Sequence, residues 1–305
     1  MKEKLSRAIK DICEREGFFK SGFSKFEKLP TEIGHLKTWV NEGRNADMEW
    51  ISRHTDKRED VSLILNGIKS IISLAYIYDT PFDNKDSFPK ISRYAWGKKD
   101  YHKVLKKKLK NICKEIESLS EDVLTKFYVD DGPVLEKVWA VKSGIGWMGK
   151  HSNIITADAG SFFFLSEILI NKELKYDTPV DDLCETCRVC VDACPTGAIY
   201  EEYKVDAKLC ISYQTIENKN DIPSYLDLSG WIFGCDVCQD VCPYNKKKFF
   251  TEDESFYPMK GIFGKSANEL SGMSEEEFNK VFADSPVKRT KYAGWKRNLK
   301  RVLIR

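Results

Sequence analysis

The 305-residue sequence lacks any long hydrophobic run and any N-terminal signal segment. Its longest apolar stretches, such as SFFFLSEILI, extend over about ten residues, roughly half of what a membrane-spanning helix needs. The first residues, MKEKLSRAIKDICERE, are charged throughout and contain no continuous apolar core of the kind found in signal peptides. We therefore expect a cytoplasmic protein with no membrane partner.

A dominant charge of either sign is also missing. The chain has 49 Lys and Arg residues against 47 Asp and Glu residues, a formal net charge of +2. The net charge therefore does not indicate binding to nucleic acid or to a membrane surface. The distribution is uneven, however, because no acidic residue follows Asp284. The basic residues after it are Lys288, Arg289, Lys291, Lys296, Arg297, Lys300, Arg301 and Arg305.

The familiar signatures of organic cofactors are absent as well. The sequence contains no G-x-G-x-x-G fingerprint, no P-loop and no H-E-x-x-H motif. Its four histidines, His35, His54, His102 and His151, show no metal-ligand spacing. Physical chemistry alone therefore identifies no organic cofactor in the long N-terminal part of the chain.

Cysteine, in contrast, is abundant and clustered. In a reducing compartment, grouped cysteines indicate metal ligation rather than disulfides. The spacing C-x2-C-x2-C-x3-C-P, typical of bacterial ferredoxins, is formed by Cys184, Cys187, Cys190, Cys194 and Pro195. In that arrangement three thiolates bind one iron–sulfur cube and the fourth binds a second cube, so a partner motif is required.

The partner motif follows about forty residues later. Cys235, Cys238 and Cys242 precede Pro243 in the spacing C-x2-C-x3-C-P, and Cys210 supplies the missing ligand. We assign one [4Fe–4S] cluster to Cys184, Cys187, Cys190 and Cys242, and the other to Cys194, Cys210, Cys235 and Cys238. Zinc, which also binds four cysteines, is the alternative metal, and a purely structural brace is the alternative role. The two proline-terminated runs favour a redox module.

The remaining sequence predicts a layered arrangement of helices and strands. Amphipathic helices are predicted over the first sixteen residues and around 105–119, with Cys13 and Cys113 on their apolar faces. We expect strands at 70–78, 124–130, 152–157 and 161–169, and a helix from about Pro133 to Ser143 capped by Gly144. Composition changes divide the chain into a large domain (1–178), a cysteine-rich module (179–250) and a basic helical extension (251–305).

Several segments together resemble the epoxyqueuosine reductase family. They are ISRYAWGKKDYHKVLKKKL, YVDDGPVLEKVWAVKSGIGWMGKHSNIIT, GSFFFLSEIL, LCETCRVCVDACPTGAI, CISYQTIE and GCDVCQDVCPYN. The resemblance extends in order from about Met48 to Asn245, with a weaker match in SPVKRTKYAGWKRNLKRVL. The cysteines alone would suit many iron–sulfur proteins, whereas these segments in combination are specific.

The resemblance implies an α+β fold in which a reductive-dehalogenase-like cobalamin domain adjoins a two-cluster ferredoxin-like module and a short helical extension. It further implies base-off cobalamin, a low-potential electron donor and a monomeric enzyme. The implied reaction removes the epoxide oxygen of epoxyqueuosine at the wobble position of tRNA, giving queuosine. The implied substrates are the anticodon loops of the tRNAs for Tyr, His, Asn and Asp.

The resemblance also implies the proton donor, which would be Asp130. A carboxyl that donates a proton near neutral pH should be desolvated, with a raised pKa. A carboxylate that stabilises a helix terminus is the alternative role. The family usually has Thr or Ser where this chain has Asp131, and two adjacent carboxylates facing one pocket would disfavour each other's ionisation. We therefore expect Asp131 to point to solvent.

The other implied contacts rest on shorter matches. Candidates for cobalamin contact are Arg53, Arg93, Ile154, Leu165 and Ser212, with surface salt bridges or strand core as the alternatives. Candidates for tRNA phosphate contact are Lys288, Arg289, Lys291, Lys296 and Arg297. An ordinary basic helix packed through Trp295, Leu299 and Val302 is the alternative for the tail. Two other functions stay open: a corrinoid reductase of a small molecule, and a non-catalytic electron carrier.

Overall fold

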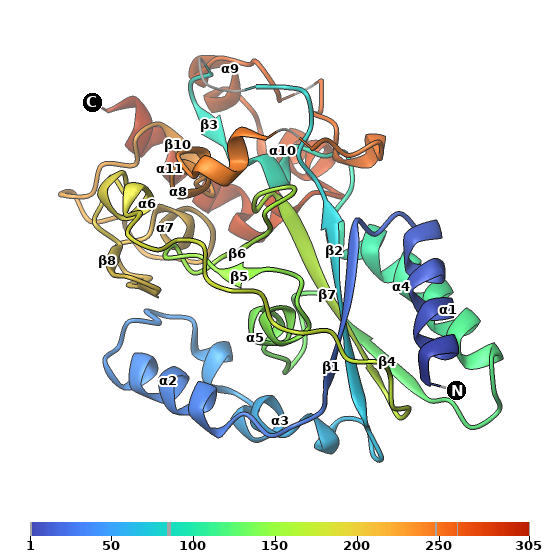
Figure 1. Cartoon of the computed structure of the whole chain (residues 1–305). Helices are drawn as coiled ribbons and strands as arrows, with labels where there is room; N and C mark the ends of the chain where they lie inside the picture. The colour runs from blue at the N-terminus through green and yellow to red at the C-terminus, as the bar shows by residue number, and fades with distance from the viewer. Residues whose placement is uncertain (1, 84–86, 248, 261, 305) are drawn as a thin grey trace.

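A twisted four-stranded antiparallel sheet lies at the centre of the molecule (Figure 1). The structure is a computed structural model that describes residues 2–83, 87–247, 249–260 and 262–304. The strand order is β1-β2-β7-β4, with bounds Lys20–Lys25 (β1), Ser70–Ile77 (β2), Phe163–Ile170 (β7) and Thr125–Tyr128 (β4). The two central strands, β2 and β7, pair along their whole length from Ser70↔Ile170 to Ile77↔Phe163. The three long strands that the sequence predicts thus form one sheet.

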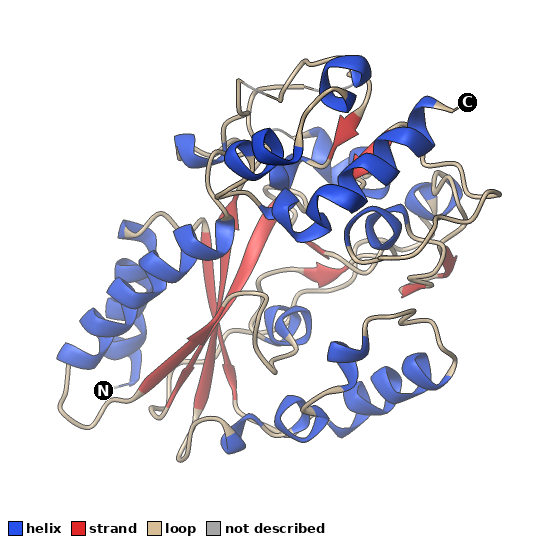
Figure 2. Cartoon of the chain, turned by 180° about the vertical axis from the view of Figure 1, so that it is seen from behind, coloured by secondary structure: helices blue, strands red, loops and turns tan. Residues whose placement is uncertain are grey.

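Helices cover both faces of this sheet, as the two views show (Figures 1 and 2). On one face α1 (Lys2–Arg15) and α4 (Tyr101–Ser118) pack through Ile9, Leu105 and Leu109 against Ile72 and Leu74. The other face carries α2 (Pro30–Asn41), α3 (Thr55–Glu59) and α5 (Glu136–Lys142). Because both faces are covered, β2 is buried along its whole length, which explains its continuous apolar sequence.

Two predicted boundaries in this region are wrong. The helix predicted from about Pro133 begins at Glu136, because Pro133 and Val134 belong to the loop that precedes it. The strand predicted at 152–157 shrinks to Ile154–Ile155 (β6), paired with Trp147–Met148 (β5). The predicted C-terminal glycine is confirmed, since Gly144 follows the helix at φ +68, a left-handed conformation that glycine adopts without strain.

The cysteine-rich segment and the C-terminal segment are built from short elements. The former contains α6 (Val189–Asp192), β8 (Ile199–Glu201), β9 (Lys204–Val205), α7 (Ile211–Ile216), β10 (Trp231–Phe233) and α8 (Val237–Asp240). The latter contains α9 (Ala267–Ser271), α10 (Glu275–Val281) and α11 (Lys291–Leu303). Short 3-10 turns are η1 (Glu49–Ser52), η2 (Val61–Leu63), η3 (Arg93–Ala95), η4 (Pro243–Lys246), η5 (Glu254–Phe256) and η6 (Pro286–Thr290).

A shared apolar core joins these segments to the rest of the chain. Strand β10 pairs in parallel with β3 (Lys90–Ile91), which follows the central strand β2 in sequence. The core around this pair contains Trp231 and Phe233 together with Trp295, Leu299 and Val302 of α11. The C-terminal helix thus packs through the three side chains that the alternative interpretation of the tail named. The domain boundaries at 178/179 and 250/251 stay a prediction.

A buried ion-pair network supplies a second link between the N-terminal part and the cysteine-rich segment. The side chain of Arg93, in η3, is 4% exposed and lies 3.5 Å from Asp79 and 3.6 Å from Asp236. Its guanidinium also donates to Asp240, on α8. The backbone N–H of Arg93 donates to Asp236 at 2.8 Å, and the Ser92 hydroxyl donates to the same carboxylate. This network connects the segment just after β2 to Cys235, which precedes α8, and to Cys238, which lies in α8.

Among the residues that the structure describes, no helix combines the length and the apolar character needed to cross a membrane.

The network predicts a large effect of removing the Arg93 guanidinium. Arg93→Met leaves Asp236 fully buried without its counter-charge, and breaking a buried pair in this way costs about 3–5 kcal/mol. We expect a clear drop in the midpoint of thermal unfolding of the anaerobically purified protein. The control Arg15→Met removes an exposed pair with Glu115, which contributes about 0–1 kcal/mol. Equal midpoints for the two variants would contradict a role for the network in stability.

Candidate functional site

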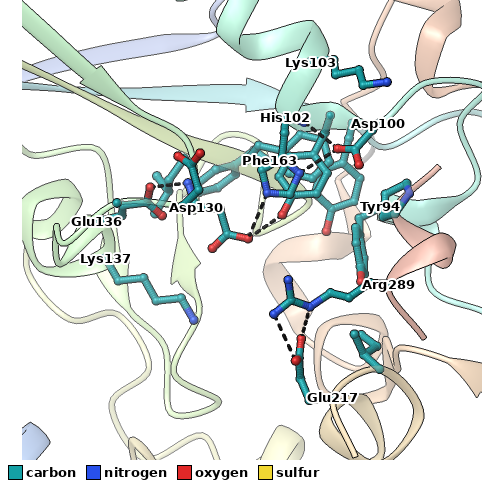
Figure 3. A pocket seen from close by; sticks show the side chains of 18 of the residues that line it. Tyr94, Asp100, His102, Lys103, Asp130, Glu136, Lys137, Phe163, Glu217 and Arg289 are labelled. Carbon is teal, nitrogen blue, oxygen red and sulfur yellow. Dashed lines mark hydrogen bonds and ion pairs between the residues drawn. The ribbon is translucent and has the colours of Figure 1, made fainter. Parts of the chain in front are cut away.

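A large open cavity lies at the end of the sheet where β7, the loop after β4 and the start of α4 meet (Figure 3). Its volume is about 1080 Å³. Aromatic and aliphatic side chains form one wall, among them Phe163, Phe164 and Leu165 of β7. Charged side chains come from several parts of the chain: Arg53 and Arg58, Asp130, Glu136 and Lys137, and Lys288 and Arg289. The cavity thus joins an apolar wall to a polar rim, as ligand sites commonly do.

The carboxyl of Asp130 points into this cavity from the loop between β4 and α5. It accepts a hydrogen bond from the hydroxyl of Tyr101 and lies 3.9 Å from Nε2 of His102 (Figure 3). The other ring nitrogen of His102 is 2.7 Å from Asp100. Two neighbouring side chains of α4 therefore fix the direction of the carboxyl, and Asp100 in turn orients the imidazole.

The expectation that Asp130 is desolvated is wrong for this structure. Its side chain is 61% exposed, because the group lies on the wall of an open cavity. The backbone of Asp130 adopts φ +54, an uncommon left-handed conformation for a residue with a side chain. The loop is also tightly built, since a Cβ at Gly132 would meet the ring of Tyr128 at 2.0 Å.

Asp131 only partly follows the prediction that it faces solvent. Its side chain is 42% exposed, but it also lines the cavity. The ammonium of Lys106, on α4, forms an ion pair with it. The two adjacent carboxylates are therefore held by different partners, and Asp131 carries its own counter-charge.

Two carboxyls beside Asp130, the half-buried Glu136 and the fully buried Glu167, were not predicted from the sequence. Glu136, the first residue of α5, accepts the backbone N–H of Asp130 at 2.6 Å. Burial, and then the charge of Asp130, raises the pKa of Glu136 to about 8. Glu167, on β7, is 0% exposed, and burial next to Glu136 raises its pKa far above the usual range. A sequence signal existed, because Glu167 is the single charge in SFFFLSEILI.

Lys137 extends along the cavity wall beside Glu136 (Figure 3). Its ammonium donates to the backbone oxygen of Ser152 at 2.8 Å and to Oδ1 of Asn153 at 3.0 Å. The residue is exposed to the open cavity, but desolvation by the surrounding protein atoms lowers the pKa of its ammonium. It therefore contributes a fixed donor and a positive charge near Asp130.

The eight cysteines of the two motifs gather in two adjacent sets. Cys184, Cys187, Cys190 and Cys242 line one cavity of about 230 Å³. The indole N–H of Trp147 lies 3.4 Å from the sulfur of Cys184. In the second set, burial and then the neighbouring Cys210 raise the pKa of the Cys238 thiol, with smaller effects of Cys190 and Cys194. Burial likewise raises the pKa of Cys235, beside Cys238 and Cys210.

These two sets have the composition that [4Fe–4S] clusters require. Each contains four thiols, and the crossed membership of Cys194 and Cys242 is the one that two-cluster ferredoxins use. Within the described ranges, no three or more His, Cys, Asp or Glu side chains converge closely enough to hold a single metal ion. The remaining two cysteines, Cys13 and Cys113, are buried in the apolar core, as predicted.

The structure brings only some of the other predicted contact residues to the cavity. Arg53, Ile154 and Leu165 line it. Arg93 does not belong to the described lining, because its side chain is buried in the ion-pair network with Asp79, Asp236 and Asp240. Ser212, on α7, is also outside the described lining.

The predicted tRNA contacts likewise include residues that line the cavity and residues that do not. Lys288 and Arg289 line the cavity, where Arg289 forms an ion pair with Glu217. Lys291 is exposed at the start of α11. Lys296 and Arg297 instead donate to backbone oxygens, Lys296 to Ser271 and Arg297 to Gln214, Asn218 and Asn220. Their positive charges therefore serve to hold α11 against the chain.

Comparison with known proteins gives a consistent result over the whole chain. Residues 58–131 match the family described as "Epoxyqueuosine reductase QueG, DUF1730", and residues 183–245 match the "4Fe-4S double cluster binding domain". The epoxyqueuosine reductase of Cellulophaga algicola is 44% identical over 98% of this chain and 98% of its own length. That of Escherichia coli is 38% identical over 97% of this chain and 79% of its own length.

Solved structures give the same picture. A crystal structure of epoxyqueuosine reductase with an epoxyqueuosine-modified tRNA-Tyr stem loop superposes with a TM-score of 0.89 at 29% identity. The match covers 98% of this chain and 81% of that chain. A catabolic reductive dehalogenase superposes with a TM-score of 0.51 at 13% identity, covering 99% of this chain and 38% of that chain. The second likeness concerns the fold alone.

The two cysteine sets predict how iron content responds to mutation. Cys242→Ser removes a thiol from the set that also contains Cys184, Cys187 and Cys190, although it lies about fifty residues away in the sequence. We expect the anaerobically reconstituted variant to lose about half of its iron and acid-labile sulfide. The control Cys113→Ala changes a buried thiol of the core and should retain the full iron content. Full iron content in Cys242→Ser would contradict the assignment.

Proposed function

The chain belongs to the epoxyqueuosine reductase family, and we propose that it reduces epoxyqueuosine in tRNA to queuosine by cobalamin-dependent removal of the epoxide oxygen. The observation that carries the proposal is the placement of Asp130. Its carboxyl points into a cavity of about 1080 Å³, in a fold that superposes on a tRNA-bound epoxyqueuosine reductase over 98% of the chain. The proposed electron path is formed by the two sets of four cysteines, of which Cys210 and Cys238 act on the charge of Lys137 in the cavity wall.

The residues around the cavity suit a large, partly apolar cofactor such as cobalamin. The apolar wall of Phe163, Leu165 and Ile154 suits the flat face of a corrin, and the polar rim with Arg53 suits its amide and phosphate periphery. The cavity volume lies just above the usual range for ligand sites, about 300–1,000 Å³, as a large cofactor requires. When bound, cobalamin supplies a strongly reducing cobalt centre, for which the two clusters deliver single electrons.

The chain's own contribution to the reaction is proton delivery and orientation. Removal of the epoxide oxygen as water requires protons at that oxygen, and the Asp130 carboxyl faces the space where the epoxide would lie. Tyr101 and His102 hold this carboxyl, and Asp100 holds His102. The imidazole, within 3.9 Å of Asp130, is placed to return a proton to the carboxylate after each turnover.

Recognition of tRNA is assigned to the basic residues at the opposite side of the cavity. Lys288 and Arg289 lie on the cavity wall, and the exposed Lys291 continues this surface. Such side chains contact phosphates and make binding sensitive to salt. The proposed substrates are the tRNAs for Tyr, His, Asn and Asp, the electrons come from a low-potential donor, and the enzyme acts as a cytoplasmic monomer.

The proton-donor assignment predicts the effect of Asp130→Asn. An amide cannot donate a proton with the acidity of a carboxyl, so the single-turnover rate should fall about 10²–10⁴-fold. Digested tRNA is analysed for queuosine by mass spectrometry, and iron content and cobalamin binding are measured in parallel. Iron content and cobalamin binding should stay unchanged in the variant. The control Asp122→Asn alters an exposed carboxylate paired with Lys172 and should react like the wild type. A wild-type rate in Asp130→Asn would refute the donor role.

The placement of the basic residues predicts which lysines matter for tRNA. Lys288→Ala should raise the Kd for the anticodon stem loop and reduce the slope of log Kd against log salt by about 1, because one phosphate contact is lost. The matched control is Lys300→Ala, which removes an exposed charge on α11 outside the described lining. Equal salt slopes for both variants and the wild type would contradict a phosphate contact at Lys288.

A further inference from the structure

Two carboxyls, the fully buried Glu167 and the half-buried Glu136, lie between the sheet and the loop that carries Asp130. Glu167 points from β7 towards α5, opposite Ser73 of β2, and neighbouring side chains on that face belong to the core with Trp139. It is 0% exposed, and in the described part of the chain no donor reaches either of its carboxyl oxygens. An ionised carboxylate in that position would be strongly destabilised, since neither water nor a donor compensates its charge.

The group that faces Glu167 is another carboxyl, that of Glu136. Two carboxyls in contact can form a hydrogen bond only when at least one of them holds a proton. The charged groups around the pair do not change this requirement. Asp130 and Asp131 add negative charge from the loop after β4, whereas Lys137 of α5 and Arg58 of α3 face Glu136 rather than Glu167. The ammonium of Lys137 is hydrogen-bonded to Ser152 and Asn153.

The second feature of the pair is its link to Asp130. Oε1 of Glu136 accepts the backbone N–H of Asp130 at 2.6 Å, and Asp130 has the uncommon φ of +54. A residue with a side chain keeps such a conformation when its surroundings hold it there. The same conformation directs the carboxyl of Asp130 towards Tyr101 and His102 (Figure 3). A continuous set of contacts therefore leads from the buried sheet to the proton donor.

We propose that Glu136 and Glu167 share a proton and that this carboxyl pair is the positioning element that holds Asp130 in its reactive conformation. Protonated Glu167 donates to Glu136, and Glu136 accepts the N–H of Asp130. Glu136 and Glu167 are positioning residues, since they act through the backbone of Asp130. The role in catalysis rests on the proposed reductase function, whereas the shared proton does not.

The shared proton has a pH-dependent consequence. Burial raises the pKa of both groups, so at neutral pH the pair retains a proton, and this proton leaves only as the pH rises through the alkaline range. Two carboxylates then repel each other beneath the Asp130 loop. In Glu167→Gln, an amide N–H replaces the shared proton and stays in place at every pH.

A spectroscopic experiment tests the shared proton without any assumption about function. The infrared spectrum of the purified protein is recorded at pH 7 for the wild type, Glu167→Gln and the control Glu275→Gln. Glu275 is, like Glu136, the first residue of its helix, but it is exposed. We expect a carboxylic-acid C=O band that is present in the wild type and the control and missing in Glu167→Gln. Identical acid bands in all three proteins would overturn the proposal.

A kinetic experiment tests the positioning role. Glu136→Ala removes the acceptor for the Asp130 N–H, and the single-turnover rate should fall about 10–100-fold, as for misplaced catalytic groups. Glu136→Gln retains a carbonyl oxygen and should restore the rate to within about threefold. Iron content and cobalamin binding should be unchanged in both. A wild-type rate in Glu136→Ala would overturn the positioning role.

The pH profile separates this role from a purely structural one. The ratio of the Glu167→Gln rate to the wild-type rate should rise at least about threefold between pH 7 and pH 9, because only the wild type loses the shared proton. A ratio that is constant with pH would overturn the proposal. If the wild type itself does not convert the substrate, the reductase function fails, and the infrared result still decides whether the proton is shared.

Discussion

The buried guanidinium of Arg93 is the contact on which the arrangement of the site depends. It joins Asp79, at the end of the central strand β2, to Asp236 and Asp240, which flank Cys238 in the cysteine-rich segment. The parallel pairing of β3 with β10 acts at the same junction. Because Arg93, Asp79 and Asp236 are buried, their positions are tightly specified, and Cys235 and Cys238 are held at a defined place relative to β2. Electron transfer needs such a fixed spacing between redox groups.

The cavity itself combines a rigid wall with a constrained loop. Strand β7 provides Phe163 and Leu165, and the loop after β4 provides Asp130 in a left-handed conformation. The loop cannot relax freely, since it is tied to Glu136 on one side and to Tyr101 on the other. The proton donor is thus exposed to the cavity while its backbone is fixed. This combination suits a group that must meet a large substrate and still keep its orientation.

Those parts of the fold and of the site that have a local sequence signal could be predicted from the sequence. The spacing of the cysteines predicted two sets of four, and apolar periodicity predicted α1, α4 and the three long strands. The position of Arg93 was not predictable, because a single arginine gives no sign of whether carboxylates far away in the sequence surround it. The exposure of Asp130 was predicted wrongly, since burial depends on the shape of a cavity formed by distant segments. Glu167 gave a signal, a lone charge in an apolar strand, but its partner Glu136 is close only in the folded chain.

The most direct test of the account is the fate of the epoxide oxygen. Anaerobic wild-type protein with both clusters is incubated with a strong reductant and tRNA that carries epoxyqueuosine, with and without cobalamin, and the digested nucleosides are analysed by mass spectrometry. The account predicts conversion to a nucleoside lighter by one oxygen atom, and only when cobalamin is present. An unchanged nucleoside, in protein shown to contain both clusters and cobalamin, would contradict it.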